Sequence, residues 1–173
     1  YDFVMCAMDE LVNQIAKIRY MFGGQAKPAV VVRMPHGMWR NSAAQHSQML
    51  EAWFAHLPGV VVVTPSTPAD TAGLLVQAIR SDDPVLFFEH KALYRRIKED
   101  LPAGDYTVPI GKARVFREGR DLSIITYGAM VYAALEAADV LEREGISVEI
   151  VDLRTLLPLD EETVLASVRK TSK

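Results

Sequence analysis

The chain has few of the residues that mark secreted, zinc-binding or polyanion-binding proteins. Its 173 residues include one cysteine, Cys6, which excludes an internal disulfide and leaves no ligand spacing for a structural zinc ion. Nineteen basic against 22 acidic side chains give a formal charge of −3, so we expect no nucleic-acid partner. No apolar run approaches the roughly 20 residues that cross a bilayer, so we expect no membrane span. The single cysteine therefore favours a reducing compartment, and we expect a protein that is not secreted.

The first ninety residues alternate between amphipathic segments and short apolar ones. Apolar residues recur at helical spacing after the candidate caps Asp2 and Ser42, and Thr67 precedes Pro68 as a cap precedes the first helical turn. Half of all residues are apolar, which is ample for a buried core. We predict an α/β fold with a parallel sheet flanked by helices. The predicted helices span 2–23, 42–57 and 68–79, and the predicted strands span 29–34, 60–63 and 85–88, with Pro35 ending the first strand.

Residues 91–120 interrupt this pattern with charged, proline-containing and glycine-containing segments, and we interpret them as a linker. Residues 1–90 then form one domain and residues 121–173 part of a second α/β domain. Two strands leave open sheet edges, so we expect the second domain to continue beyond residue 173. Tyr1 is not an initiator methionine, so we also expect the chain to be a piece of a longer protein. In the second domain we predict strands at 122–126 and 146–151, a helix at 130–144 that Gly145 ends, and a helix that starts at 158–160.

The histidines are candidates for acid–base chemistry, because imidazole titrates near neutral pH. His46 follows a strand and its loop, which is where ligands bind in open α/β sheets. Its spacing on the predicted helix favours a different interpretation, a partly buried imidazole hydrogen-bonded to Gln45 or Gln48. His56 ends the same predicted helix and interacts with the helix dipole.

Polar residues beside the strand ends carry weaker signals. Glu89 directly follows a predicted strand, where a carboxylate can act as a base, but we favour the interpretation of an ion pair with Arg95 or Arg96. His36 and His90 lie in similar places but lack the spacing of metal ligands. No GxGxxG or Walker sequence is present, so no nucleotide-binding fingerprint is predicted.

Several ordered segments resemble one protein family closely. On them the chain is identified as a member of the β subunits of the thiamine-diphosphate-dependent component of 2-oxo acid dehydrogenase complexes, within the transketolase-like superfamily. These complexes include pyruvate and acetoin dehydrogenases. Two segments, Met21-Phe22-Gly23-Gly24 and Glu89-His90-Lys91, are more similar to acetoin-type and related bacterial members than to branched-chain members. The resemblance covers essentially the whole chain. Its main motifs are Ala44-Gln45-His46-Ser47-Gln48, Pro65-Ser66-Thr67-Pro68-Ala69-Asp70, Phe88-Glu89-His90-Lys91-Ala92-Leu93-Tyr94 and Val151-Asp152-Leu153-Arg154-Thr155-Leu156-Leu157-Pro158.

The resemblance implies both an architecture and an assembly. Residues 1–90 become a pyrimidine-type thiamine-diphosphate-binding domain without its amino-terminal part, and residues 121–173 part of a transketolase carboxyl-terminal-like domain. An α subunit completes a heterotetramer and holds most of the cofactor's diphosphate and its magnesium. The assembly takes a small 2-oxo acid of the pyruvate type, or acetoin, and passes an acyl group to the lipoyl group of an acyltransferase core.

Site residues follow from the resemblance residue by residue. His46 becomes an active-site residue whose imidazole donates the proton that the departing lipoyl sulfur requires. Phe3 matches an aromatic residue that packs on the cofactor's aminopyrimidine ring, and its other interpretation is ordinary core packing. In the resembled family a glutamate forms a hydrogen bond with the aminopyrimidine ring nitrogen, and this glutamate is expected upstream of Tyr1. A monovalent cation such as potassium is also implied, bound by backbone carbonyls around Val30, Val31, Ala78, Ser81 and Asp83, where it would hold the sheet beside His46 in place.

Two other functions remain as alternatives. One is a transketolase or deoxyxylulose phosphate synthase, which requires basic residues for a sugar phosphate. The other is a non-catalytic α/β assembly subunit in which His46 is structural. In addition, the loop before His46 contains Trp39 and Arg40 where many members of the resembled family have small residues, so we expect access to the site or substrate choice to differ.

Overall fold

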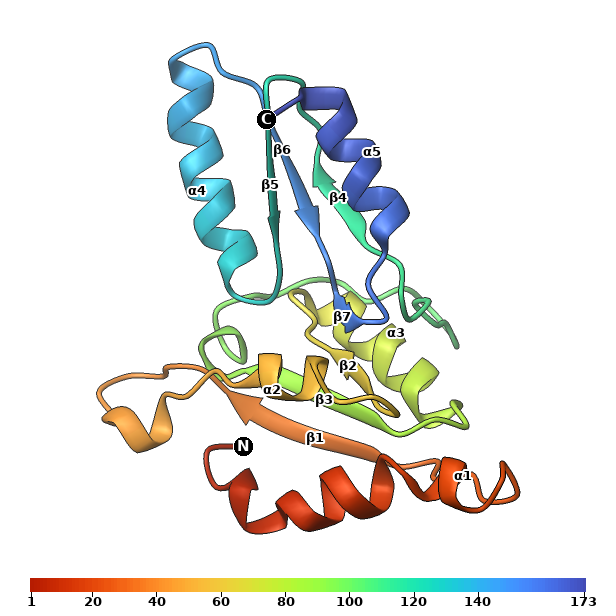
Figure 1. Cartoon of the computed structure of the whole chain (residues 1–173). Coiled ribbons are helices and arrows are strands. Elements are labelled where there is room, and N and C mark those ends of the chain that lie inside the picture. Colours follow the sequence, from red (N-terminus) through yellow and green to blue (C-terminus); the bar gives the residue numbers. More distant parts are fainter.

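Two sheets organise the chain, which the computed structural model describes from Tyr1 to Lys173. Figure 1 shows one sheet above the other, with β7 below the end of β6 and next to β2. The first sheet has the order β1-β3-β2-β7, with β1 at Val31–His36, β2 at Val61–Val63, β3 at Val85–His90 and β7 at Thr155–Leu157. The second has the order β4-β6-β5, with β4 at Arg114–Arg117, β5 at Leu122–Thr126 and β6 at Val148–Asp152.

The first three strands of the first sheet are parallel. Strands β1 and β2 both pair with β3, which places Val31 and Val61 opposite Val85. The residues from Val85 to Glu89 are all buried, because helices cover both faces of the sheet. This explains the continuous apolar run from which the strand was predicted, and it confirms the predicted parallel sheet.

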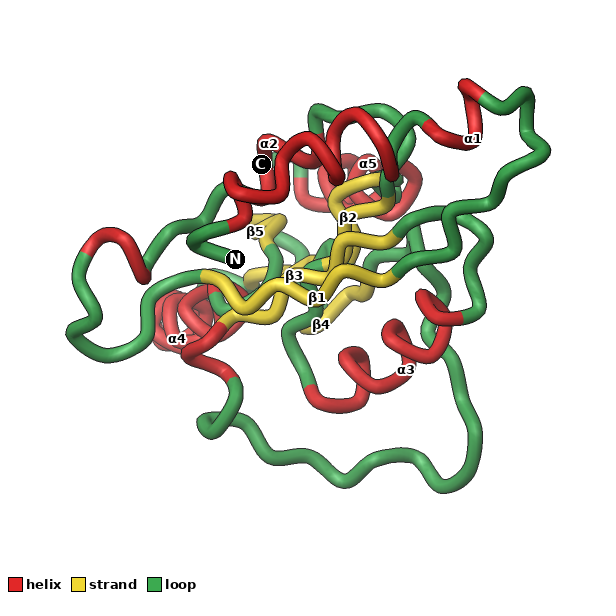
Figure 2. Tube along the Cα trace, turned by 90° about the horizontal axis from the view of Figure 1, so that it is seen from below, coloured by secondary structure: helices red, strands yellow, loops and turns green.

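Helices pack on both faces of this sheet (Figure 2). Helix α3 (Pro68–Ile79) covers one face, where Leu74 and Ala78 join the core cluster of Val85 and Phe87. Its predicted cap is confirmed, since the Thr67 hydroxyl accepts a hydrogen bond from the backbone N–H of Asp70 at 3.1 Å. The other face is covered by α2 (Glu51–Ala55) and the amino-terminal helical segment, whose core residues include Phe54, Leu11 and Ala16.

The amino-terminal segment is helical but is not the single regular helix that was predicted. It consists of a 3₁₀ turn at Val4–Ala7, a π-helical segment at Asp9–Ile15 and α1 at Ile18–Met21. The N–H of Ala16 reaches the Leu11 carbonyl, five residues back, at 3.1 Å, and both residues are buried against the sheet. Asp2 does not cap a helix, because its carboxylate is used in long-range contacts described below.

The predicted helix at 42–57 is also wrong in its first half. The structure has a 3₁₀ turn at Ala44–His46 and places α2 only at Glu51–Ala55. The intervening segment is tied elsewhere, since the Gln48 carbonyl accepts from the N–H of Gly37 at 2.9 Å and the Gln48 N–H donates to Asp2. Pro35 lies inside β1 rather than after it, which is possible because β1 is an edge strand and needs no outward N–H.

The second unit contains the predicted β5–α4–β6 arrangement and two further strands. Strands β5 and β6 are parallel, and α4 (Met130–Arg143) and α5 (Glu161–Thr171) lie beside them. Strand β4, which falls within residues 91–120, pairs antiparallel with β6. Strand β7 pairs antiparallel with β2 and so joins the carboxyl-terminal unit to the first sheet. No helix in the structure combines the length and apolar character that a bilayer span requires.

Candidate functional site

The carboxyl ends of β1 and β3 form the start of the candidate site. His36 and His90 are the last residues of these strands and are paired in register, with ring centroids 5.4 Å apart. In open α/β sheets, ligands bind beyond this end of the strands. The loop that follows His36 leads to His46, so the topology brings three of the four histidines to one end of the sheet.

His46 and Phe3 lie together on the surface at this end. Their ring centroids are 5.6 Å apart with an interplanar angle of 67°, and the side chain of Phe3 is 64% exposed. The spacing-based expectation that His46 is partly buried and hydrogen-bonded to Gln45 or Gln48 is therefore wrong. That expectation assumed that His46 lies on the predicted helix at 42–57, whereas His46 belongs to a short exposed turn. Core packing is likewise the wrong interpretation for Phe3.

A buried carboxylate holds this arrangement in place. The Asp2 carboxylate accepts from the N–H of Gln48 at 3.1 Å and from the Lys91 ammonium at 2.8 Å. Lys91 also donates to the backbone carbonyl of His46 at 2.7 Å. Although burial acts to raise the pKa of Asp2, the bonds from Lys91 and Gln48 outweigh it and lower this pKa. Asp2 therefore stays charged and fixes Phe3, its neighbour in sequence, beside the His46 turn.

A second buried group lies beneath the same end of the sheet. His36 Nδ1 and Glu51 Oε2 are 3.3 Å apart, both side chains are almost fully buried, and Glu51 accepts from the Tyr127 hydroxyl at 2.9 Å. Burial acts to raise the pKa of Glu51, but the neighbouring His36 and Tyr127 outweigh it and lower this pKa. Tyr127 directly follows β5, so this contact links the two units at the edge of the candidate site.

His90 is kept neutral by its surroundings. Burial, followed by the proximity of His36, lowers the pKa of His90 to about 4. Its Nδ1 accepts from the N–H of Ala92 at 3.2 Å, which leaves the ring packed against Gly37. Gly37 has a φ of +75°, and a Cβ there would lie 2.2 Å from the His90 ring. At neutral pH, therefore, His90 offers no charge to an anionic ligand.

Glu89 forms an ion pair, as predicted, but with other partners. Its carboxylate accepts from Arg33 Nε at 2.7 Å and from the Tyr94 hydroxyl at 2.7 Å, and no contact with Arg95 or Arg96 is formed. The pairing of β1 with β3 explains this, because it places Arg33 close to Glu89 across the sheet. No local spacing in the sequence reports that neighbour.

The positions proposed for a cation lie at the opposite end of the sheet. Val30 and Val31 are at the start of β1, whereas His36 at its far end is roughly 16 Å away at the usual rise of a strand. Ala78, Ser81 and Asp83 precede the start of β3. A cation at these positions would therefore not support the part of the sheet directly beside His46. That a cation binds there stays a prediction.

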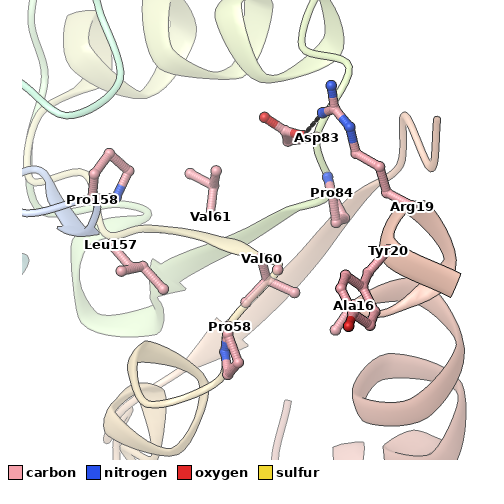
Figure 3. Close-up of a pocket in the computed structure, with 11 residues that line it drawn as sticks. Ala16, Arg19, Tyr20, Pro58, Val60, Val61, Asp83, Pro84, Leu157 and Pro158 are labelled. Atoms are coloured by element: carbon pink, nitrogen blue, oxygen red, sulfur yellow. Dashed lines mark hydrogen bonds and ion pairs between the residues drawn. The ribbon is translucent and has the colours of Figure 1, made fainter. Parts of the chain in front are cut away.

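A cavity of about 530 Å³ opens at this opposite end (Figure 3). Ala16 and Tyr20 line it from the amino-terminal segment, and Pro58, Val60 and Leu157 line it from the strand side. The Asp83 carboxylate faces it and is paired with the guanidinium of Arg19. No group of three or more His, Cys, Asp or Glu side chains able to hold a metal ion occurs in the structure.

Sequence reasoning missed the residues that position the site. Asp2 meets Lys91 across 89 residues of chain, and Tyr127 meets Glu51 across 76. Contacts at such separations leave no periodicity or motif in the sequence. The signal that remained was indirect: Asp2 and Glu51 each adjoin an apolar run, where an unpaired charge is costly.

Comparison with known domains identifies the two units. A model of the transketolase pyrimidine binding domain matches residues 1–97, and a model of the transketolase C-terminal domain matches residues 111–173. The chain belongs to the transketolase family. Strands β1, β2 and β3 fall within the first match, and β4, β5 and β6 within the second. Family membership, first read from sequence motifs, is thus confirmed.

Relatives of this transketolase-family chain include dehydrogenase β subunits. It is 56% identical over 172 residues to the acetoin:2,6-dichlorophenolindophenol oxidoreductase subunit beta of Cupriavidus necator, covering 99% of this chain and 51% of that protein. It is 51% identical over 172 residues to the 2-oxoisovalerate dehydrogenase subunit beta of Bacillus subtilis, covering 99% of this chain and 53% of that protein. It is 50% identical over 173 residues to the pyruvate dehydrogenase E1 component subunit beta of Bacillus subtilis, covering 100% of this chain and 53% of that protein. The chain spans about half the length of these curated relatives.

A solved structure supports the same fold for this transketolase-family chain. A split-gene transketolase in an inactive beta4 tetramer matches with a TM-score of 0.70 and 28% identity, covering 95% of this chain and 52% of that one. Family membership implies thiamine diphosphate as cofactor. The three relatives differ in the substrate that their names carry and are similarly identical to the chain, so the acetoin-type subdivision stays a prediction.

Proposed function

We propose that the chain is part of the β subunit of a thiamine-diphosphate-dependent dehydrogenase that acts on a pyruvate-type 2-oxo acid or on acetoin. The observation that carries the proposal is the exposed Phe3–His46 pair at the carboxyl end of the parallel sheet. The names of the relatives support the substrate class. An α subunit in a heterotetramer and a lipoyl-bearing acyltransferase core are the proposed partners, in the bacterial cytoplasm or the mitochondrial matrix.

The exposed residues fit one end of the cofactor. Phe3 offers a flat apolar ring, 64% exposed, to which an aminopyrimidine ring can pack. The family resemblance assigns the diphosphate and magnesium to the α subunit, and this chain has neither a phosphate-binding fingerprint nor a carboxylate cluster for magnesium. When bound, thiamine diphosphate supplies the electron sink for cleavage of the bond beside the substrate carbonyl.

His46 is proposed to move protons next to this ring. Imidazole can take up and release a proton near neutral pH, and this ring is exposed beside Phe3 rather than engaged in the core. The backbone carbonyl of His46 accepts from Lys91, which is paired with Asp2, so the backbone that carries the imidazole is anchored. The proposed role is to donate the proton that a departing lipoyl sulfur requires.

The test is reconstitution of the full-length chain with its α subunit, thiamine diphosphate and magnesium. Activity is measured with an artificial electron acceptor against pyruvate, branched-chain 2-oxo acids, acetoin and sugar phosphates. We expect turnover of one of the first three and none of the sugar phosphates. An assembled, cofactor-loaded complex that turns over only sugar phosphates, or nothing at all, contradicts the proposal.

The role of His46 is tested by His46→Ala with His56→Ala as matched control. His56 is an exposed histidine at the end of α2, away from the Phe3–His46 pair. We expect His46→Ala to lower transfer to a lipoyl acceptor by about 100-fold or more, in the range of lost acid–base catalysis, while cofactor binding persists. His56→Ala is expected to stay within about twofold of the original. Equal activity of both variants in intact complexes contradicts the assignment.

A further inference from the structure

Basic and aromatic side chains gather beside the His46 turn, outside the Phe3–His46 pair. They line a groove of about 330 Å³. Three of its six lining residues are cations and none is a carboxylate, in a chain whose formal charge is −3. The lining residues are Pro35, Trp39, Arg40, Lys91, Tyr94 and Arg95.

The positive charge of this groove is only partly compensated. Asp2 neutralises Lys91 at 2.8 Å, and the nearby Glu89, which accepts from Tyr94, is paired with Arg33. Arg40 and Arg95 form none of the ion pairs found within 4.0 Å in the structure. Two guanidinium groups therefore face the groove region as uncompensated charges.

Arg40 is held in position by its own loop. Its guanidinium carbon lies 5.2 Å from the centroid of the Trp39 ring, in cation–π geometry. Its backbone has a φ of +55°, a conformation that side-chain-bearing residues rarely adopt, and Ala43 nearby has a φ of +63°. The Ser42 hydroxyl closes the turn by donating to the Trp39 carbonyl at 3.0 Å. The cation is thus presented by a formed turn.

We propose that this groove binds the anionic group, phosphate or carboxylate, of a small ligand that also has a flat apolar part. Guanidinium forks bind both groups through paired N–H donors. The rings of Trp39 and Tyr94 supply surface for the flat part, and the Tyr94 side chain is 53% exposed.

The groove adjoins the candidate active site but is separate from it. Lys91 lines the groove and donates to the His46 carbonyl at 2.7 Å, whereas Phe3 and His46 are not among the lining residues. The inference goes beyond the proposed function, because it requires neither thiamine diphosphate nor turnover. It also gives a role to Trp39 and Arg40, which the proposed reaction leaves unused.

The test is calorimetric titration of the full-length protein, assembled with its α subunit and saturated with thiamine diphosphate and magnesium. The probes are inorganic phosphate, acetate, phenyl phosphate and benzoate. We expect saturable binding of one anion type, tighter for its phenyl-bearing form. The double variant R40Q/R95Q is expected to weaken this binding at least tenfold. The matched control R143Q/R169Q removes two exposed, unpaired arginines on α4 and α5 and is expected to bind as the original does.

A second variant separates ligand binding from support of the fold. Arg40→Gly removes the cation and relieves the backbone at φ +55°, so the unfolding midpoint is not expected to fall while anion binding weakens. The phosphate and carboxylate arms decide which group the site takes, and binding of either one supports the proposal. Absence of saturable binding by the original protein, or equal affinities for R40Q/R95Q and R143Q/R169Q, overturns it.

Discussion

The Asp2 carboxylate and the Lys91 ammonium lie 2.8 Å apart although they are 89 positions apart in the sequence. Asp2 also accepts from the N–H of Gln48, and Lys91 donates to the carbonyl of His46. One partly buried ion pair therefore connects the amino terminus, the end of β3 and the His46 turn. The juxtaposition of Phe3 and His46 depends on it.

Replacing Lys91 tests this connection. Lys91→Met leaves Asp2 buried without its main counter-charge, and we expect a loss of about 3 kcal/mol in the free energy of unfolding, as for a broken buried pair. The proposed activity should also fall, because the His46 turn loses an anchor. The measurement is urea unfolding of the full-length protein, with Lys27→Met as control. Lys27 pairs with Asp82 on the exposed surface, so about 0–1 kcal/mol is expected, and equal losses would show that Asp2–Lys91 acts as a surface pair.

Local patterns account for the part of the fold that the sequence reveals. Val85-Leu86-Phe87-Phe88 identified β3, and Thr67-Pro68 identified the start of α3, because burial on both faces and helix capping depend on neighbouring residues. The resemblance to a known family pointed to His46 and Phe3, and the structure brings them together. Strand β7 was not foreseen, since its short apolar sequence pairs with β2 about ninety residues earlier. The turn before α2 was missed because the backbone of Gln48 forms hydrogen bonds with Asp2 and Gly37 instead of helical ones, and neither partner is near it in sequence.

Gly37 is expected to tolerate no side chain. In Gly37→Ala the new Cβ would lie 2.2 Å from the His90 ring, in addition to the cost of a φ of +75°. Gly104 has a φ of +83° with open space around it, so Gly104→Ala carries the backbone cost alone, about 1 kcal/mol. We expect Gly37→Ala to cost about 2 kcal/mol more, the usual size of an overpacking effect, in urea unfolding. Similar losses for the two variants would mean that His90 moves aside freely.

Arg154 is expected to hold the two units together. Its guanidinium donates to buried Asp70 at 2.8 Å and to the carbonyls of Lys112 and Ala113 at 3.0 and 3.2 Å. Arg154→Met leaves Asp70 with a single partner, Arg114 at 3.5 Å, and we expect a loss of about 3 kcal/mol. Arg114→Met removes the longer, more exposed contact and should cost about 1 kcal/mol or less. Thermal unfolding and protease sensitivity of residues 91–120 are the measurements, and the reverse order of the two losses would contradict this account.

Asp152 gives the junction a predictable pH dependence. Burial raises the pKa of Asp152 to about 6, against lowering contributions from the Ser66 hydroxyl and the N–H of Arg154. Asp70 also raises this pKa and the Arg154 charge lowers it. The folded state therefore binds the proton more tightly than the unfolded chain does.

The sign of the effect follows from this difference. The stabilisation is complete below about pH 4, where Asp152 is protonated in both states, and is lost as the pH rises through 6. A shift of this size corresponds to about 3 kcal/mol. We expect the difference in unfolding free energy between the original protein and Asp152→Asn to fall by up to that amount between about pH 4 and pH 7. Asp100→Asn, at an exposed position, should show no such trend. A difference that stays constant or grows with pH would mean that Asp152 is charged in the folded state throughout this range.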